Sequence, residues 1–336
     1  MTDPDLTREG PSAGRPPREA RMWEKGGRRP RLWRSRELTA PDSDSRSYYG
    51  KPIIKRPGWK PLDIAGYLFL GGLAGASSVM AAAADGTGRP RLARVAKIGS
   101  LVSITLSGVA LVHDLGRPER FLNMLRVVKP TSPMSIGSWI LTIYAPGAGV
   151  AVITDVTGWF PWIGRAATAW AALTGPAVLS YTAVLICNTA VPSWHAAYRE
   201  MPFLFAGSAL GAAAGLGMLA APPEETDLAR GAAVIGAAVE LATLYQMHRR
   251  LGPLFVPYRR GRPGALMRAS EVLTVAGTLA AVTIGRRNRL CGMLAGTALI
   301  VASACTRFGV FEAGIVSASE AKYTVMYQRL RPSDAG

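Results

Sequence analysis

The sequence contains few charged residues for its length. Charged residues make up 18% of its 336 residues, whereas hydrophobic residues make up 49%. A soluble domain usually carries about 25% charged residues. The shortage of charge argues against a soluble enzyme and favours a chain that lies largely in a bilayer.

Cysteine is also scarce, with three residues, Cys187, Cys291 and Cys305, and no CxxC motif. Iron–sulfur clusters are normally held by four cysteine thiolates. This chain alone therefore lacks the ligands for such a cluster, and its cysteines do not indicate a disulfide framework. We expect them to pack within apolar segments.

Acidic residues are outnumbered, with 22 Asp and Glu against 39 Lys and Arg, which gives a formal net charge of +17. A basic balance can indicate binding to nucleic acid. Here the basic residues gather in the N-terminal region and in the loops between apolar segments, as they do in membrane proteins. We therefore expect no nucleic-acid partner and a lipid bilayer as the main surroundings.

The first 60 residues contain no long apolar run. The pair Arg28-Arg29 is not followed by an apolar h-region before Pro61, so no twin-arginine signal is predicted. Residues 1–48 are rich in Arg, Pro and Ser, which is typical of a disordered basic arm. Residues 1–60 are thus predicted to be a basic cytoplasmic arm and interfacial lead-in. The arm would remain solvated or become ordered against a partner subunit or an anionic lipid surface.

Long apolar segments are abundant in the rest of the chain. A bilayer core requires about 20 apolar residues per helix. Eight segments reach this length, at about 62–84, 93–114, 134–156, 166–188, 202–221, 227–248, 265–285 and 290–316. The sequence therefore predicts an all-α integral membrane protein with eight transmembrane helices in residues 61–316, followed by a C-terminal tail at 317–336.

Eight spans place both ends of the chain on one side of the membrane, which we call side A. The loops at 115–133, 189–201 and 249–264 share side A, and the opposite side, side B, has the short links at 85–92, 157–165, 222–226 and 286–289. Basic residues flanking the first and last spans give side A the larger positive charge, which predicts that it is cytoplasmic. We expect a multi-pass protein of the inner (plasma) membrane with cytoplasmic N and C termini.

Ionisable residues in membrane spans are costly and are functional candidates by default. Asp63 and Tyr67 are spaced i, i+4 and share one face of the first span. His113 and Asp114 end the second span on side A, and Tyr181 lies near the side-A end of the fourth. Carboxylates and phenols near the interface are able to hydrogen-bond a quinone carbonyl and exchange its protons, although buried tyrosines often only satisfy their own hydroxyls.

Glu240 is predicted to lie in the middle of the sixth span. It is either a buried proton-carrying acid or an acid paired with Arg268 or another polar group. Gly71 and Gly75 form a GxxxG pattern in the first span, which predicts a close-packed helix surface that is also thin enough to admit a flat ring.

Haem is disfavoured by the positions of the histidines. The chain has three, and all of them lie near span ends on side A, which does not suit two stacked bis-histidine haems. A single haem between His113 and either His195 or His248 remains an alternative. No other metal site is predicted.

Four segments carry a resemblance to a known family. The sequence resembles the NrfD/PsrC family, the membrane subunits of polysulfide-reductase-like complexes, in GYLFLGGLAGAS (66–77), DLGRPERFLNMLRVVKPTSPMSIGSW (114–139), YTAVLICNTAVPSWHAAYREMPFLFAGSAL (181–210) and SASEAKYTV (317–325).

The resemblance implies two four-helix bundles, with a quinone, usually menaquinone, bound in the first bundle near the face where a four-cluster, ferredoxin-like iron–sulfur subunit docks. A molybdopterin-type catalytic subunit often completes such complexes, and the membrane subunit itself carries no haem or iron–sulfur cluster. Asp114 and Arg117 match the DLGRP motif, which implies that Asp114 takes part in quinone or proton chemistry and that Arg117 orients it. Tyr181 matches the tyrosine region of the fourth span. Asp63 and Tyr67 stand where relatives place Asn or His, and His113 is a further candidate ligand.

The leading hypothesis is a quinone-reactive membrane-anchor subunit of an oxidoreductase, without its own substrate-converting centre. It would exchange electrons between an iron–sulfur partner and menaquinone, and Glu240 would support proton translocation. The alternatives are a membrane anchor without redox chemistry and a transporter.

Overall fold

The computed structural model describes residues 53–54, 57–114, 123, 125–126, 128–129 and 131–330, with side chains to 328. The predicted basic arm and Arg117 lie outside these residues. Eight helices of the described chain are long and apolar enough to cross a membrane. They are α1 (Pro61–Gly86), α2 (Pro90–Asp114), α4 (Pro133–Thr157), α5 (Pro161–Cys187), α7 (Met201–Ala220), α8 (Asp227–Leu251), α9 (Gly261–Val282) and α10 (Arg289–Ser319).

These helices confirm the predicted eight spans, and the described residues contain no strand. Shorter elements fill the connections and the predicted C-terminal tail: α6 (Pro192–Ala196), α11 (Ala321–Leu330), η1 (Pro223–Glu225), η2 (Gly252–Tyr258) and η3 (Ile284–Arg286).

Proline defines the start of many of these helices. Pro61, Pro90, Pro133 and Pro161 each occupy the first position of a membrane-spanning helix. Proline is favoured there because its missing N–H would have no partner in the first turn and its fixed φ already suits a helix. Proline therefore marks the first residue of four of the eight spans in the described chain.

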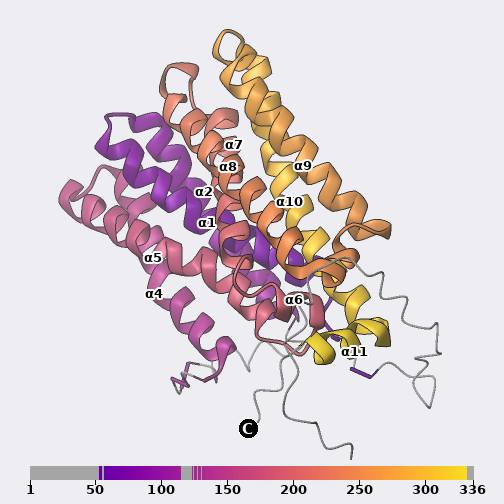
Figure 1. Ribbon diagram of the computed structural model, residues 1–336. Coiled ribbons are helices and arrows are strands. Elements are labelled where there is room, and N and C mark those ends of the chain that lie inside the picture. Colours follow the sequence, from indigo (N-terminus) through magenta and orange to yellow (C-terminus); the bar gives the residue numbers. More distant parts are fainter. Residues whose placement is uncertain are drawn as a thin grey trace, which may run out of the picture. The chain divides into compact units, whose positions relative to one another are not determined.

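The spans form two bundles of four (Figure 1). Helices α1, α2, α4 and α5 pack around one another in the first bundle, and α7, α8, α9 and α10 do so in the second. Contacts of α1 with α7 and α10, and of α5 with α7, join the bundles. This arrangement confirms the architecture that the family resemblance implied.

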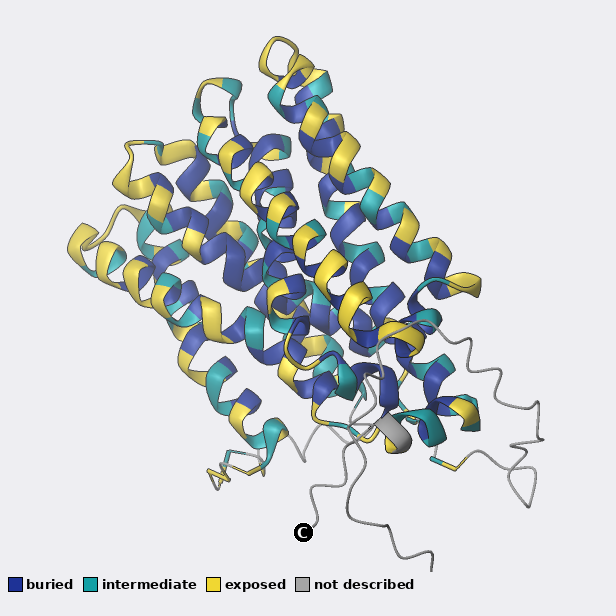
Figure 2. Ribbon diagram, in the orientation of Figure 1, coloured by how far each residue is buried: buried dark blue, intermediate teal, exposed yellow. Residues whose placement is uncertain are grey.

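The burial pattern is that of a membrane protein. Exposed residues recur along the spans (Figure 2), and many of them are large and hydrophobic. Large hydrophobic residues such as Leu173, Val272 and Leu294 are exposed, whereas Ser78, Ser100 and other polar residues are buried between the helices. A lipid environment suits this pattern, because outward apolar groups contact hydrocarbon and inward polar groups find partners within the protein.

The glycines of α1 permit close contact between helix backbones. A Cβ added at Gly75 would overlap the carbonyl oxygen of Gly175 in α5, and a Cβ at Gly71 would lie 3.3 Å from Thr182 Cγ2. The predicted close-packed surface is therefore present. Protein atoms cover it at both glycines, so it leaves no space there for a flat ring.

A buried layer of short elements joins the two bundles on side A. Trp194 of α6 is fully buried, and its indole N–H donates to the Val310 carbonyl at 2.8 Å. The Tyr258 hydroxyl donates to the Ser193 carbonyl at 3.0 Å, which fastens α6 to η2. Helix α11 also contacts α6 and lies at the same end of the molecule (Figure 1).

Candidate functional site

A cluster of ionisable groups lies where α1 begins and α2 ends, on side A. The Nδ1 atom of His113 lies 2.9 Å from Oδ2 of Asp63, and the Lys60 ammonium lies 3.9 Å from the same oxygen. The backbone N–H of Lys60 donates to Oδ1 of Asp114 at 3.3 Å. The structure thus brings together three of the predicted site residues, Asp63, His113 and Asp114. Asp63 of α1 and His113 of α2 are 50 positions apart in the sequence.

The lead-in segment holds this cluster in place. Trp59 stacks on the buried Trp194, with ring centroids 6.0 Å apart and planes 21° apart. Lys60 follows directly, so the stacking fixes the backbone that contacts Asp114. Trp59 therefore packs against protein in the structure.

Two phenols lie deeper in the first bundle. Tyr67 is one helical turn from Asp63, about 6 Å further along the α1 axis. Its hydroxyl is a hydrogen-bonding neighbour of the Tyr181 hydroxyl on α5. Both tyrosines are buried. They form a pair of phenols that lies deeper in the membrane-spanning part of the bundle than the ionisable cluster on side A.

Gly137 of α4 provides the space for this pair. A Cβ at Gly137 would overlap the ring and the hydroxyl of Tyr181. The absence of a side chain at Gly137 is therefore a condition for the position of Tyr181. Gly137 belongs to the PTSPMSIGSW segment of the motif, but sequence reasoning had not assigned it a role.

The remaining histidines have separate partners. His195 Nδ1 lies 3.0 Å from the Cys187 carbonyl oxygen, and His248 packs edge-on against Phe255. His113 pairs with Asp63, as described above. Among the described residues no group of three or more His, Cys, Asp or Glu side chains is arranged to hold a metal ion.

Glu240 lies in the second bundle, apart from the other candidates. It is buried and accepts hydrogen bonds from three hydroxyl groups, those of Thr306 at 2.7 Å and of Ser270 and Thr274 at 3.3 Å. Of the two pairings that the sequence left open, Arg268 is not the partner, because its guanidinium donates to the Arg259 carbonyl on side A, and other polar groups are. The neighbouring charge is that of Arg307.

Arg307 is a buried charge that sequence reasoning missed. It is fully buried, its Nη2 donates to the Phe205 carbonyl at 2.7 Å, and its guanidinium lies 3.9 Å from the centre of the Phe205 ring. Within the described part of the chain, its Nε and Nη1 have no hydrogen-bond partner. The available signal was an arginine more than ten residues from either end of the last span.

Lys97 of α2 is a second buried charge that was not singled out. Its ammonium lies 2.8 Å from Asp85 Oδ2 and 3.0 Å from Asp155 Oδ1, which join α2 to α1 and α4 near side B. The first bundle therefore has ionisable groups at both ends and a pair of phenols between them.

These features define a class of protein: a polytopic membrane subunit of two four-helix bundles with polar groups enclosed in each bundle. A family model described as polysulphide reductase, NrfD, matches residues 58–222. Over these residues the chain matches the NrfD family, which confirms the resemblance seen in the motifs. No curated protein matches the chain.

The match extends from the segment before α1 to the end of α7 and contains the whole first bundle. NrfD-family proteins are membrane subunits of quinone-interacting oxidoreductase complexes, and they generally assemble with iron–sulfur and molybdopterin subunits. The Asp63–His113 cluster and the Tyr67–Tyr181 pair lie within the matched residues, whereas Glu240 and Arg307 lie beyond them.

Proposed function

We propose that the first bundle binds menaquinone between the Tyr67–Tyr181 pair and the Asp63–His113–Asp114 cluster, and that this chain exchanges electrons between the quinone and an iron–sulfur partner. The observation that carries the proposal is the buried phenol pair one helical turn below a carboxylate–imidazole pair, within the NrfD-matched residues.

The donor set fits a quinone. A bound quinone accepts two electrons and two protons at its carbonyl oxygens. A phenol both donates and accepts a hydrogen bond, so Tyr67 and Tyr181 are able to hold a carbonyl oxygen before and after its protonation. An imidazole nitrogen is able to accept or to donate a proton, so His113 is able to exchange one with water at side A while Asp63 orients its ring.

Asp114 and Arg117, which lies outside the described residues, complete this assignment. Asp114 lies at the last position of α2, in the DLGRP motif, where it accepts from the Lys60 backbone. We infer that Asp114 exchanges protons at the mouth of the site, and that Arg117 orients it. Side A would then be the docking face for the four-cluster ferredoxin-like subunit, with a molybdopterin-type subunit beyond it, and it would be cytoplasmic.

Glu240 is proposed to take part in proton translocation in the second bundle. Its three hydroxyl donors and the nearby Arg307 charge are able to stabilise an anionic carboxylate, and Ser270 and Thr306 are able to accept a proton as well as donate one. An acid at this depth changes its protonation state only if a mobile charge or proton compensates for it. Quinone turnover in the adjoining bundle would supply that change of charge.

The proposal is tested by purifying the chain in mild detergent from its native membranes and measuring extractable quinone and co-purifying subunits by mass spectrometry. We expect menaquinone and an iron–sulfur protein with the wild type. Tyr181→Phe and Asp63→Asn should each lower the quinone content. Tyr245→Phe, on an exposed tyrosine of the second bundle, is the matched control and should leave the quinone content unchanged.

Two outcomes contradict the proposal. If the iron–sulfur partner co-purifies but quinone is absent in repeated gentle extractions, the chain is an anchor without redox chemistry. If neither is found, a transporter becomes the better hypothesis.

A further inference from the structure

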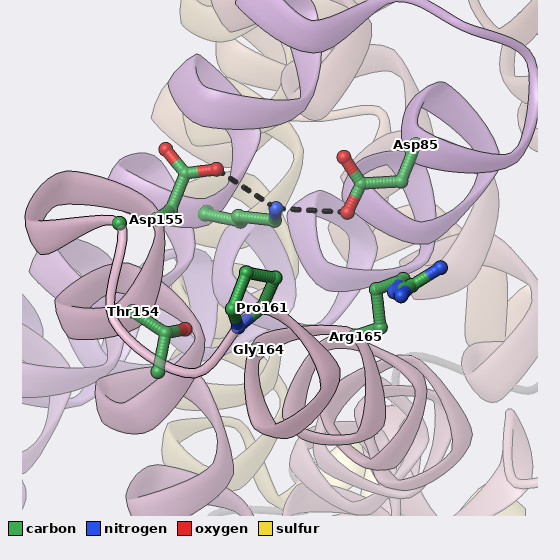
Figure 3. A pocket seen from close by; sticks show the side chains of 8 residues that line it. Asp85, Thr154, Asp155, Pro161, Gly164 and Arg165 are labelled. Atoms are coloured by element: carbon green, nitrogen blue, oxygen red, sulfur yellow. Dashed lines mark hydrogen bonds and ion pairs between the residues drawn. The ribbon is translucent and has the colours of Figure 1, made fainter.

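A cavity of about 400 Å³ lies on side B of the first bundle (Figure 3). Its lining includes Asp85, Lys97, Asp155 and Arg165. The two carboxylates bind the Lys97 ammonium from opposite directions (Figure 3). Lys97 is 8% exposed, and its ammonium lies in the wall of a cavity whose other lining residues belong to the side-B ends of α1, α4 and α5 and to the link between α4 and α5.

A second, much smaller cavity continues inward from the first. Lys97 lines both cavities, and Ser78, Ser100 and Thr168 line the inner one. Its remaining lining residues are alanines, which leave the hydroxyls as its polar groups. The inner cavity, of about 10 Å³, therefore places three hydroxyl-bearing residues beyond Lys97 in the membrane-spanning part of the bundle.

The hydroxyls of Ser78 and Ser100 are hydrogen-bonded to that of Tyr144, which lies in the middle of α4. The Tyr144 hydroxyl lies 2.8 Å from Ser100 Oγ, contacts Ser78 Oγ, and donates to the Ala74 carbonyl at 2.8 Å. The Ser78 and Ser100 hydroxyls lie 2.9 Å apart. All three side chains are buried, and each hydroxyl is able both to accept a proton and to release one.

The interval from Tyr144 to the phenol pair is short. From Ala74 to Tyr67, α1 rises about 10 Å, because each residue adds 1.5 Å. The Ser107 hydroxyl lies in this interval and donates to the Tyr67 carbonyl at 3.2 Å. Leu141 and Val178 belong to the same apolar core as Tyr67 and Tyr144, and a few water molecules would be needed to complete a path for protons through it.

We propose that the side-B cavity is the entrance of a proton inlet that runs through Lys97 and the hydroxyls of Ser78, Ser100 and Tyr144 toward Tyr67 and Tyr181. This inference rests on the proposed quinone site and adds a source for its protons. It lies in the first bundle and does not involve Glu240. Lys97 passes a proton inward and regains one from the cavity, where Asp85 and Asp155 stabilise its charged form.

The inlet has an electrical consequence. Reduction of one quinone consumes two electrons from the partner on side A and two protons. If the protons come from side B, positive charge crosses the membrane with each turnover, and a membrane potential forms. If they come from side A, the reaction is electroneutral.

The test uses the native complex reconstituted in liposomes that contain menaquinone. Reduced benzyl viologen supplies electrons at side A, and a voltage-sensitive dye reports the membrane potential. The wild type should generate a potential that is positive on side A. Tyr144→Phe should reduce its initial rate of formation at least tenfold, while quinone content remains at the wild-type level.

Two further variants separate proton transfer from damage to the fold. Lys97→Met should abolish the membrane potential. Lys97→Arg should abolish it too, because arginine retains the charge but does not release a proton, and this variant should keep the wild-type thermal stability. Tyr245→Phe is the matched control and should generate the wild-type potential. A wild-type rate of potential formation in Tyr144→Phe, or no potential in the wild type, would overturn the inlet. Loss of quinone from the wild-type complex would instead refute the proposed quinone site.

Discussion

Gly137→Ala tests whether the position of Tyr181 is essential for quinone binding. The added methyl group would overlap both the ring carbon that bears the hydroxyl and the hydroxyl oxygen itself. Tyr181 must therefore move, or α4 and α5 must separate. Either change would break the hydrogen-bonding relation between Tyr181 and Tyr67.

The size of the effect follows from two terms. Overpacking a buried site costs about 1–3 kcal/mol, and alanine offsets part of this because it is favoured over glycine in helices by about 1 kcal/mol. The loss of one hydrogen bond to the quinone weakens binding by about 1 kcal/mol, or about fivefold. We expect a fall in free energy of unfolding of up to about 2 kcal/mol and a fall in quinone affinity of at least fivefold.

The assay measures quinone binding and thermal unfolding of the purified complex for Gly137→Ala and two comparison variants. Gly149→Ala is the matched control on α4, because a Cβ there would meet only Leu101, at 4.0 Å. Tyr181→Phe removes the hydroxyl without adding volume, so it should weaken quinone binding with little change in stability. If Gly137→Ala behaves like Gly149→Ala in both measurements, the geometric reasoning about Tyr181 is refuted.

Three further predictions concern the helix contacts and the second bundle. Gly75→Ala should lower the thermal unfolding midpoint, because its methyl group would overlap the α5 backbone, whereas Gly66→Ala, with nothing within 4 Å of the added carbon, should not. Glu240→Gln should abolish the part of proton translocation that depends on the second bundle while quinone content is retained, and unchanged pumping by the reconstituted complex would contradict the proposed role. Arg307→Met should destabilise the protein by about 3–5 kcal/mol because it leaves a buried charged partner, and the double variant with Glu240→Gln should recover part of this loss in a double-mutant cycle.

The sequence by itself determined the class of the fold. Apolar length predicted eight spans whose bounds the structure confirms within a few residues, because in a bilayer each span must satisfy its backbone hydrogen bonds internally. The long DLGRP-containing motif predicted the NrfD family, which the family match bears out for residues 58–222. Local spacing also placed Asp63 and Tyr67 on one helix face.

Only the tertiary structure decided which distant groups meet. The pairing of Asp63 with His113 and of Tyr67 with Tyr181 depends on how α2 and α5 pack against α1, and no sequence period encodes that packing. The partners of Glu240 are hydroxyl groups of α9 and α10 and not Arg268, and the sequence had left both alternatives open. Sequence reasoning assigned no role to Lys97 or Arg307, because the partners of both side chains lie on other helices. A buried charge is defined by its surroundings, and in a helical membrane protein those surroundings come from other helices.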